Sequence, residues 1–367
     1  HSPVCGTVGD IVEITGVTGA SEQAVEIIAD GTDEWDTGLD PIPDWADTEK
    51  DVLKKRILDA GIVGMGGAAF PTHVKLSPPP EKNIDTLIVN GAECEPFLTA
   101  DHRLMLTRTE EALTGIAIAA KILKVSRIFV GVEDNKMDAI EKMAEAAAKF
   151  KITVVPLHVK YPQGAEKQLI YALTGRQVLE GGLPMDVGCV VMNIGTAAAV
   201  HDAVVLGHPL IERVTTVTGT PVVDPANYLV RIGTPIRKLL ELSGGVKENP
   251  AKVIMGGPMM GFAQSNIDVP VAKNSSGVLL MAPEEIEQFE GNPCIRCSRC
   301  VKACPMNLLV PTLSTMIEAG EFAMAEHNYV MDCVECGTCA YICPAKRPLV
   351  QHFRRAKAEI LAKRRKK

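Results

Sequence analysis

Eight of the eleven cysteines of this chain lie between residues 294 and 344, in two similar runs. The first run is C-I-R-C-S-R-C-V-K-A-C-P (294–305), and the second is C-V-E-C-G-T-C-A-Y-I-C-P (333–344). In the pattern Cys-x2-Cys-x2-Cys-x3-Cys-Pro, three thiolates wrap one cubane cluster and the fourth ligates the neighbouring cluster. The spacing therefore predicts two [4Fe-4S] clusters. The predicted ligands are Cys294, Cys297, Cys300 and Cys343 for cluster 1, and Cys304, Cys333, Cys336 and Cys339 for cluster 2.

Zinc and disulfides are the alternatives for these cysteines, and both fit the pattern less well. Zinc sites use separated pairs of ligands, which explains neither the third cysteine of each run nor the proline after the fourth. Disulfides are typical of short secreted chains, whereas this chain has 367 residues and no recognisable signal peptide. The cysteine usage indicates a reducing compartment.

A second candidate site is the loop G-I-V-G-M-G-G-A-A-F-P-T-H-V-K (61–75), which is rich in glycine. Glycine leaves backbone N–H groups accessible, so such a loop can lie against a phosphate and a flavin ring while Lys75 supplies a positive charge. A simple turn is the alternative reading, and the spacing alone does not decide between the two.

Polar residues also follow three further segments of the same region. V-N-G-A-E-C-E-P (89–96), Y-P-Q-G-A-E-K (161–167) and V-M-N-I-G-T-A (191–197) place amides, carboxylates and a hydroxyl at expected strand ends or in a loop before a helix. Ligands of open α/β sheets bind at the carboxyl ends of the strands. A solvated acidic loop remains the alternative for Glu93 and Glu95.

The elements that position these residues alternate along the chain. Short apolar runs at 86–90, 127–132, 152–157 and 188–193 predict strands, with helical patterns near 109–124, 134–149 and 165–173 between them. A first helix is expected from Thr48, as its N-cap, to Gly61. Alternation of this kind predicts a three-layer α/β domain with a largely parallel sheet over residues 48–207.

The remaining segments have a different character. Residues 208–283 combine strand-like runs and glycine turns with one short helix, and residues 284–347 hold the cysteines with a helical insert near 308–327. Residues 29–47 are acidic and rich in turn residues, which predicts a connector. The opening residues, from His1, resemble the middle of a domain, so we expect a preceding segment.

Composition excludes several classes of protein. Apolar residues make up 46% of the chain and charged residues 23%, as in a globular protein, and no uncharged apolar run reaches the roughly 18 residues that cross a bilayer. The formal charge of −7 and the aromatic content of 4% argue against a nucleic-acid groove. Residues 348–367 predict a basic amphipathic helix that docks on partner subunits or an anionic membrane surface.

The motif strings resemble those of a known family. G-x-G-G-A-x-F-P-T-x-x-K (64–75), N-x-x-E-x-E-P (90–96) and N-x-x-T (193–196), followed by the two cysteine runs, resemble the C subunit of the Rnf complex, an ion-translocating ferredoxin:NAD+ oxidoreductase. The strings Y-P-Q-G-A-E-K-Q-L-I, G-T-A-A-A-V and T-V-T-G-T-P are also similar to that subunit, and the resemblance covers almost the whole chain. It extends to the NADH-binding flavin subunit of respiratory complex I.

The resemblance implies a multidomain α/β protein. It implies a partial barrel-sandwich hybrid (lipoyl-like) segment at 1–28, a Rossmann-like FMN/NAD(H) domain at 48–207, a soluble-ligand-binding β-grasp (SLBB) module at 208–283 and a two-cluster ferredoxin domain at 284–347. The implied FMN residues are Gly64, Gly66, Gly67, Lys75, Asn90, Glu93, Gly164, Asn193 and Thr196. The implied NAD(H) residues are Phe70, Glu95, Tyr161 and Glu166.

Three positions depart from the pattern of the complex I flavin subunit. Ala69 stands where that motif has glycine, while Ala165 and Gly195 replace acids. Fewer acids therefore surround the expected position of the dinucleotide than in that subunit.

The implied function is that of the NAD(H)-reactive subunit, in which FMN exchanges hydride with NAD(H) and single electrons with two [4Fe-4S] clusters. Expected partners are a ferredoxin-accepting iron–sulfur subunit and membrane-embedded subunits that move Na+ or H+, with the chain peripheral on the cytoplasmic side of the cell membrane. The alternatives are a soluble cobalamin reductase of bacterial microcompartments and an electron-wiring subunit without flavin. No catalytic side chain is expected, since the cofactors carry the chemistry.

Several other residues are expected to be structural. Cys5, Cys94 and Cys189 are predicted to be buried free thiols, although Cys94 also lies within the predicted pocket. Met259 and Met260 are predicted to fill a core, and His73 to play a structural part.

Overall fold

The computed structural model describes residues 1–247, 249–286 and 291–365. The chain divides into two compact units. One unit comprises His1–Gln177 and Pro184–Glu285, and the other comprises Val178–Leu183 and Ile286–Lys367.

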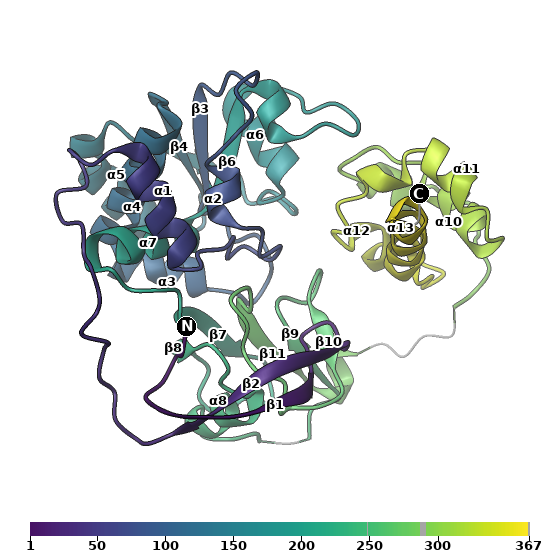
Figure 1. Ribbon diagram of the computed structural model, residues 1–367. Coiled ribbons are helices and arrows are strands. Elements are labelled where there is room, and N and C mark those ends of the chain that lie inside the picture. Colours follow the sequence, from purple (N-terminus) through teal and green to yellow (C-terminus); the bar gives the residue numbers. More distant parts are fainter. Residues whose placement is uncertain (248, 287–290, 366–367) are drawn as a thin grey trace. The chain divides into compact units, whose positions relative to one another are not determined.

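A four-stranded parallel sheet forms the centre of the first unit. Its strand order is β5-β4-β3-β6, and every neighbouring pair is parallel. Helices lie on both sides of it, with α4 and α5 on one side and α6 on the other (Figure 1). All four strands were predicted, and they are β3 (Thr86–Asn90), β4 (Arg127–Glu133), β5 (Thr153–Leu157) and β6 (Cys189–Asn193).

The predicted helices around this sheet begin and end close to the predicted positions, whereas α2, α3 and α7 were not predicted. The glycine of α4, Gly115, is required by packing, because a Cβ there would come within 1.7 Å of the carbonyl oxygen of Ala197 in α7. The helices are α1 (Lys50–Asp59), α2 (Thr72–Lys75), α3 (Ala100–Thr107), α4 (Thr109–Leu123), α5 (Met137–Ala147), α6 (Glu166–Thr174) and α7 (Ile194–His201), with the short turns η1 (Ala148–Phe150), η2 (Pro184–Val187) and η3 (Asp202–Leu206).

The beginning of α1 differs from the prediction. Glu49, not Thr48, occupies the N-cap position, and its side chain makes no capping hydrogen bond. The hydroxyl of Thr48 instead donates to the carbonyl oxygen of Asp44 at 3.2 Å, within the turn that precedes the helix. Because Thr48 is engaged there, the helix begins one residue later than a threonine cap would place it.

A second sheet in the same unit has the order β10-β9-β11-β7-β8, with β7 and β11 parallel and the other pairs antiparallel. One helix, α8 (Ile236–Leu242), packs on it through Ile236 and Leu239, which share a core with Val217 and Val278. This is the small β-rich module that the sequence predicts. Its strands are β7 (Glu212–Thr218), β8 (Ala226–Arg231), β9 (Lys252–Met255), β10 (Phe262–Gln264) and β11 (Gly277–Met281), followed by the turn η4 (Pro283–Glu285).

The N-terminal segment forms a two-stranded antiparallel ribbon of β1 (Gly6–Thr15) and β2 (Ser21–Ala29). The predicted barrel-sandwich hybrid stays a prediction for this segment. The acidic connector that follows packs against the segment after α7 in the same unit. The indole of Trp35 stacks on His208 with ring centres 3.8 Å apart, and the N–H of Ile42 donates to the carbonyl oxygen of Val204.

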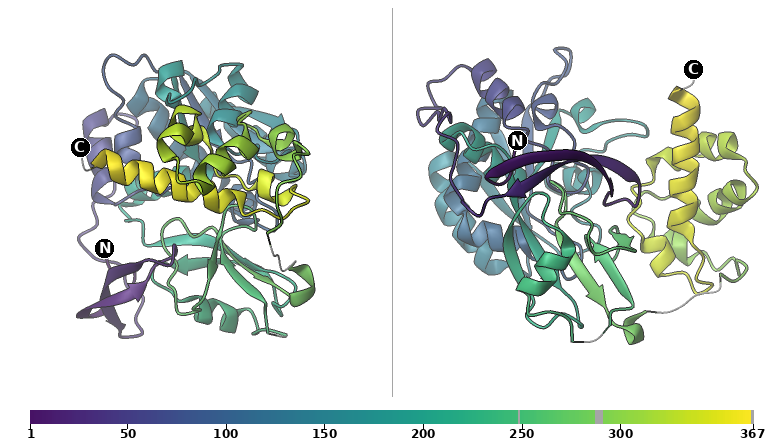
Figure 2. Two further views of the ribbon diagram at one scale, coloured as in Figure 1. Left: turned by 90° about the vertical axis from the view of Figure 1, so that its right-hand side faces the viewer. Right: turned by 60° about the horizontal axis from the view of Figure 1, so that its bottom comes forward.

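The second unit is helical. Its longest helix, α13 (Leu349–Arg365), packs along the shorter ones through Leu349, Phe353, Ala356 and Ile360, which are buried in the core of this unit (Figure 2). The other elements are α9 (Arg299–Ala303), α10 (Val310–Glu318), α11 (Phe322–His327), η5 (Val330–Asp332) and α12 (Thr338–Tyr341).

The structure corrects the expectation for the C-terminal segment in part. Most of the apolar face of α13 is covered by its own unit and is therefore not free to dock elsewhere. Arg354 and Lys357 pair with Glu335, and Arg364 pairs with Glu326. Lys366 and Lys367 of the predicted basic tail lie outside the described residues. Among the described residues, no helix is both long and apolar enough to cross a bilayer.

Candidate cofactor sites

The carboxyl edge of the parallel sheet brings together residues that the sequence places about 100 positions apart. Asn90 ends β3 and Asn193 ends β6, and the two are direct neighbours in the sheet register. The side-chain amide of Asn90 donates to the carbonyl oxygen of Gly164 at 2.9 Å. The side-chain oxygen of Asn193 caps α7 by accepting from the N–H groups of Gly195 and Thr196. Three predicted segments therefore meet at one edge.

The glycine loop lies against this edge. The N–H of Met65 donates to the hydroxyl of Thr196 at 2.9 Å, which ties the loop to the start of α7. A Cβ on Gly66 would lie 3.3 Å from the Cβ of Asn193, and Gly67 has a φ of 122°. Among the described residues, no group accepts hydrogen bonds from the exposed N–H groups of Gly66 and Gly67. Such N–H groups fit the phosphate of a flavin nucleotide.

Lys75, which was predicted to bind FMN, forms an ion pair with Glu166, which was predicted to bind NAD(H). The ammonium nitrogen of Lys75 lies 3.0 Å from Glu166 and also donates to the carbonyl oxygen of Val191 in β6 at 2.9 Å. Both side chains are partly exposed. Lys75 thus presents a positive charge at the sheet edge, in a position fixed by the strand backbone.

Glu93 points into the protein. Its carboxylate accepts hydrogen bonds from the N–H groups of Asp101 (2.8 Å) and His102 (2.9 Å), in the first turn of α3. Burial, reinforced by the nearby carboxyl of Asp101, raises the pKa of Glu93 to about 8. With these bonds, Glu93 fixes α3 beneath the sheet edge.

Glu95 and Tyr161, both predicted to contact NAD(H), lie together. The two carboxylate oxygens of Glu95 accept from the N–H groups of Met259 (3.1 Å) and Met260 (2.8 Å), and the hydroxyl of Tyr161 donates to it at 3.5 Å. Burial raises the pKa of Glu95. Glu95 therefore joins the α/β domain to the turn after β9. Phe70, the fourth residue of this predicted group, is about half exposed on the glycine loop.

Two structural expectations are wrong. Met259 and Met260 do not fill a core: Met260 is exposed, Met259 is partly exposed, and their backbone N–H groups bind Glu95. Of the three extra cysteines, only Cys189 is buried. Cys5 and Cys94 are partly exposed. The sulfur of Cys94 accepts from the N–H of Gly164 at 3.3 Å, inside the candidate site.

Sequence reasoning missed several charged residues beneath the site. Asp101 is partly exposed and accepts from the Asn193 amide at 2.7 Å. The ammonium of Lys136 is buried and donates to the carbonyl oxygen of Ala92 at 2.9 Å. The guanidinium of Arg213 holds the carbonyl oxygens of Met65 and Lys273, and burial lowers its pKa to about 10. Only Lys136 could have been found from the sequence, because it lies just after a predicted strand, where ligands of such sheets bind.

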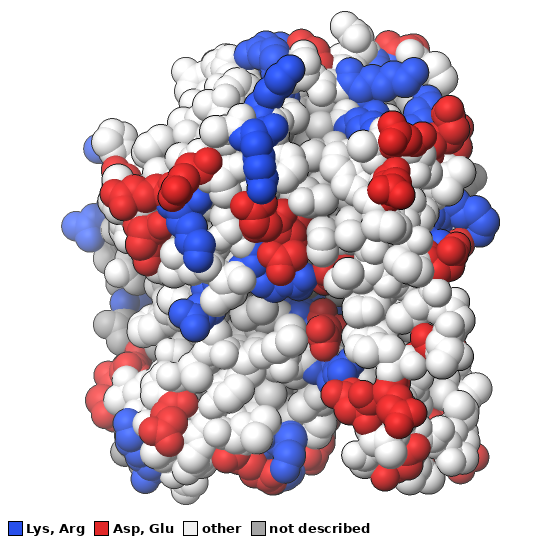
Figure 3. Space-filling model, turned by 90° about the vertical axis from the view of Figure 1, so that its left-hand side faces the viewer, with Lys and Arg blue, Asp and Glu red and all other residues white. Residues whose placement is uncertain are grey.

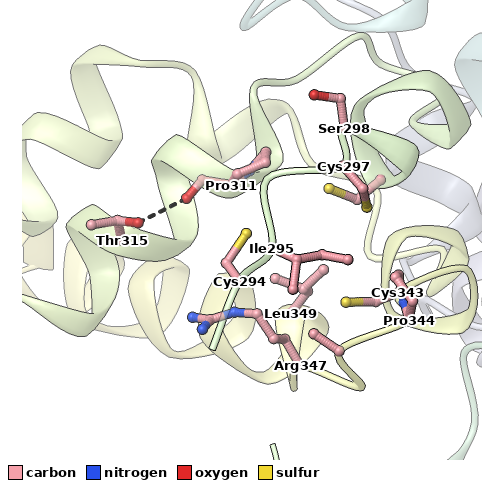
Figure 4. Close-up of a pocket in the computed structure, with 12 residues that line it drawn as sticks. Cys294, Ile295, Cys297, Ser298, Pro311, Thr315, Cys343, Pro344, Arg347 and Leu349 are labelled. Atoms are coloured by element: carbon pink, nitrogen blue, oxygen red, sulfur yellow. Dashed lines mark hydrogen bonds between the residues drawn. The ribbon is translucent and has the colours of Figure 1, made fainter. Parts of the chain in front are cut away.

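The second unit holds two hollows lined by cysteines. The first, of about 440 Å³, has one charged residue, Arg347, among the described residues that line it. Figure 4 shows Cys294, Cys297 and Cys343 around it, beside Ile295. Cys343, from the second run, therefore lies with three cysteines of the first run. The cysteines that line this hollow are Cys294, Cys297, Cys300 and Cys343.

The other hollow, of about 360 Å³, shows the reciprocal exchange. Cys304 of the first run lies with three cysteines of the second run, and Glu335 is the charged lining residue. Burial raises the pKa of the Cys333 thiol to about 11 and that of Cys339 to about 12, so binding iron must displace their protons. The cysteines that line this hollow are Cys304, Cys333, Cys336 and Cys339.

The donor sets fit clusters better than single ions. Within the described part of the chain, no three His, Cys, Asp or Glu side chains form a group that could hold one metal ion. Four sulfurs spaced around a hollow are what a cubane, whose four irons each take one thiolate, requires. The N–H two residues after each leading cysteine also donates to its sulfur, from Arg296 to Cys294 at 3.4 Å and from Glu335 to Cys333 at 3.3 Å.

Charge on the molecular surface gives no sign of a nucleic-acid groove on the face drawn in Figure 3. Basic and acidic side chains are interspersed there. Proteins that bind nucleic acids through their backbone phosphates gather Lys and Arg on one face instead.

Three family models match the chain. They are the Nuo51 FMN-binding domain over residues 57–202, the SLBB domain over residues 214–263 and the 4Fe-4S dicluster domain over residues 293–347. These matches confirm the predicted fold class for three modules. A solved structure of an NAD+-reducing [NiFe]-hydrogenase in the H2-reduced state resembles the chain with a TM-score of 0.59 and 18% identity. That likeness covers 89% of this chain and 68% of that one, and shows a shared fold.

Curated relatives are more similar in sequence. The C subunit of the proton-translocating ferredoxin:NAD(+) oxidoreductase complex of Clostridium ljungdahlii is 50% identical over 92% of this chain and 74% of its own length. The C subunit of the Na(+)-translocating ferredoxin:NAD(+) oxidoreductase complex of Acetobacterium woodii is 46% identical over 100% of this chain and 83% of its own length. In Pseudomonas aeruginosa, the C subunit of the ion-translocating oxidoreductase complex is 43% identical over 100% of this chain, which spans 48% of that protein.

Proposed function

Because this chain belongs to the family of C subunits of ion-translocating ferredoxin:NAD+ oxidoreductase complexes, we propose that it exchanges hydride between NAD(H) and FMN and single electrons with two iron–sulfur clusters. It has an FMN-binding domain and a 4Fe-4S dicluster domain in one chain. The observation that carries the proposal is the pair of hollows with four cysteines each, on the same chain as the flavin domain.

The cofactors supply the redox chemistry, since a flavin converts the two-electron exchange of nicotinamide into the one-electron exchange of a cubane cluster. The residues of the chain bind and orient the cofactors and shield them from water. We propose that the N–H groups of Gly66 and Gly67, with Gly64 and Lys75, hold the FMN phosphate. Asn90 and Gly164 would flank the flavin ring, while Asn193, Thr196 and Glu93 hold the loop and α3 in place.

For the dinucleotide, we propose the surface formed by Phe70, Tyr161, Glu95 and Glu166. The exposed ring of Phe70 offers an apolar face, and Glu166 and the Tyr161 hydroxyl offer polar groups. Glu95 would act here mainly by fixing the turn at Met259 and Met260.

The chain acts within a multi-subunit complex, as the names of its relatives indicate. We propose that its partners are a ferredoxin-accepting iron–sulfur subunit and membrane-embedded subunits that move Na+ or H+. On this proposal the chain is peripheral, on the cytoplasmic side of the cell membrane.

Anaerobic titration of the purified, reconstituted chain with NADH tests this function. The flavin absorbance should bleach first, and the broad cluster absorbance should follow. NADPH serves as the comparison nucleotide. A chain that binds FMN and iron but shows no bleaching with NADH would contradict the proposed reaction. Glu95→Gln should slow the bleaching more than it lowers FMN content.

A further inference from the structure

The two cysteine runs form a matched pair with closely similar backbone conformations. Arg296 and Glu335 occupy the same position of the run, both with a φ of 55°, and both donate their N–H to the first cysteine sulfur. The turns after the fourth cysteines also match, since Asn307 has a φ of 54° and Lys346 a φ of 52°. The site of Cys304, Cys333, Cys336 and Cys339 also has two further hydrogen bonds to sulfur, from the N–H of Leu308 to Cys304 at 3.4 Å and between the hydroxyl of Thr338 and Cys336 at 3.1 Å. These bonds favour reduction of that cluster, so charge and solvent must outweigh them if the other cluster is to be reduced first.

Side-chain charge differs systematically at four matched positions. At each of them the residue matched to the site of Cys294, Cys297, Cys300 and Cys343 (the open site) is a cation, of which Arg347 lines the hollow. The residue matched to the site of Cys304, Cys333, Cys336 and Cys339 (the covered site) is neutral or acidic. The matched pairs, open site first, are Arg296 and Glu335, Arg299 and Thr338, Lys346 and Asn307, and Arg347 and Leu308.

Partners outside the runs reduce this contrast without removing it. At the open site, the positive charge of Arg347 is offset by its ion pair with Glu318. Arg296 and Arg299 remain as two positive charges, without counting Lys346. At the covered site, Glu335 pairs with Arg354 at 3.0 Å and Lys357 at 2.7 Å, so one positive charge is in excess there. The cysteine run of the open site therefore carries more positive charge in its sequence, although Arg296 and Arg299 are not among the residues that line its hollow. At the covered site, Lys357 donates directly to the carbonyl oxygen of Cys333 at 3.0 Å.

Exposure to solvent acts in the same direction. Cys294 and Cys297 of the open site are exposed, whereas Cys336 is buried and the other cysteines of the covered site are only partly exposed. Reduction by one electron adds one negative charge to a cluster and its four thiolates. Water and nearby cations stabilise that charge, and net charge and solvent exposure are two of the factors that set cluster potentials.

We propose that the two clusters differ in reduction potential, that the cluster of the open site is reduced first, and that the residues at the matched position, Arg296 and Glu335, contribute to the difference with opposite signs. This inference rests on the cluster assignment of the proposed function. It adds the order in which the clusters are reduced: a single electron that enters the chain resides on the open-site cluster.

A redox titration with dithionite, followed by electron paramagnetic resonance, tests the inference on the full reconstituted chain. Two midpoint potentials are expected. Glu335→Gln removes the acidic group at the covered site and leaves the charges of Arg354 and Lys357 without it, so only the lower potential should rise. The electron distribution between the two clusters should change about tenfold, which corresponds to about 59 mV for one electron.

Arg296→Gln should lower only the higher potential. The expected shift is smaller than for Glu335→Gln because Arg296 is exposed and its charge is screened. Glu326→Gln is the matched control: it removes an acidic group of the same unit that pairs with Arg364 and lines neither hollow, so both potentials should stay unchanged.

The inference is overturned if Glu335→Gln moves the higher potential, or if Arg296→Gln moves the lower one. Should Glu335→Gln fail to retain its iron, Arg296→Glu decides instead, because this change at an exposed position must lower the higher potential and leave the lower one unchanged. Two equal potentials in a chain with close to eight irons would also overturn it. A chain that binds zinc and no iron would instead contradict the cluster assignment.

Discussion

The two candidate sites are built in opposite ways. Every proposed ligand of the cluster unit comes from one stretch of about 50 residues, and the two runs share matching left-handed backbone positions. The site at the sheet edge is assembled from loops that begin near residues 61, 89, 161, 191 and 257, and it exists only once the sheet has formed. A local site can be predicted from spacing, whereas a distributed site depends on contacts between distant segments.

The largest effect is expected for Cys304→Ser, which tests the crossed assignment of the cluster unit. Cys304 belongs to the first run but lines the hollow of the second run. The variant should lose or convert the cluster of Cys333, Cys336 and Cys339 and keep the other, as seen in iron content and paramagnetic resonance. Loss of the cluster at Cys294, Cys297 and Cys300 with the other intact would reverse the assignment.

Gly66→Val tests the distributed site. A Cβ at this position lies 3.3 Å from Asn193, so the branched side chain of valine must displace the loop from the sheet edge. We expect FMN content to fall at least tenfold while iron content stays unchanged. Gly38→Ala, in the acidic connector, is the control and should keep its flavin. Normal flavin content in Gly66→Val would remove the glycine loop from the site.

Glu93 gives the sheet-edge site a pH dependence of its own. Its pKa is raised to about 8 from an ordinary value of 4.5, so between these values the folded protein binds a proton that the unfolded chain has released. Stability from this group is therefore fully present below pH 4.5 and is lost as the pH rises towards 8.

Denaturant unfolding of the first unit should show a decline on the order of a few kcal/mol across this range. Glu93→Gln should flatten it, while Glu145→Gln, on the exposed face of α5, should not. An unchanged pH profile in Glu93→Gln would show that another group is responsible.

The smallest effect concerns the end of α13. Since its apolar face is largely buried in its own unit, only charge is left for docking on an anionic surface, at about 1 kcal/mol for each Lys or Arg. Deletion of residues 363–367 should weaken sedimentation with anionic vesicles at low salt and leave iron content unchanged. Equal sedimentation of the truncated and full chains would exclude a docking role for this tail.

The same contrast explains what the sequence predicts and what it does not. The four strands of the parallel sheet are visible as apolar runs, and the exchange of Cys304 and Cys343 follows from the spacing. The partners of Glu95 are not visible, because Met259 and Met260 are more than 160 residues away and bind through backbone N–H groups that almost any residue carries.

The direction of a side chain is equally hidden in a loop. Glu93 has a φ of 47°, a left-handed conformation that accompanies its inward-pointing carboxylate, although its neighbours suggest a solvated acidic loop. Local patterns do not predict such a reversal. Sequence therefore identified the segments of the distributed site better than the role of each residue within it.

Cofactor analysis of the purified chain, reconstituted with iron, sulfide and FMN, tests the central claim most directly. The account predicts close to eight irons per chain and about one FMN, released intact on denaturation because no attachment residue is expected in the glycine loop. Four irons per chain, or zinc in place of iron, would contradict the two four-cysteine sites. Full iron without flavin would contradict the sheet-edge site and favour an electron-wiring subunit.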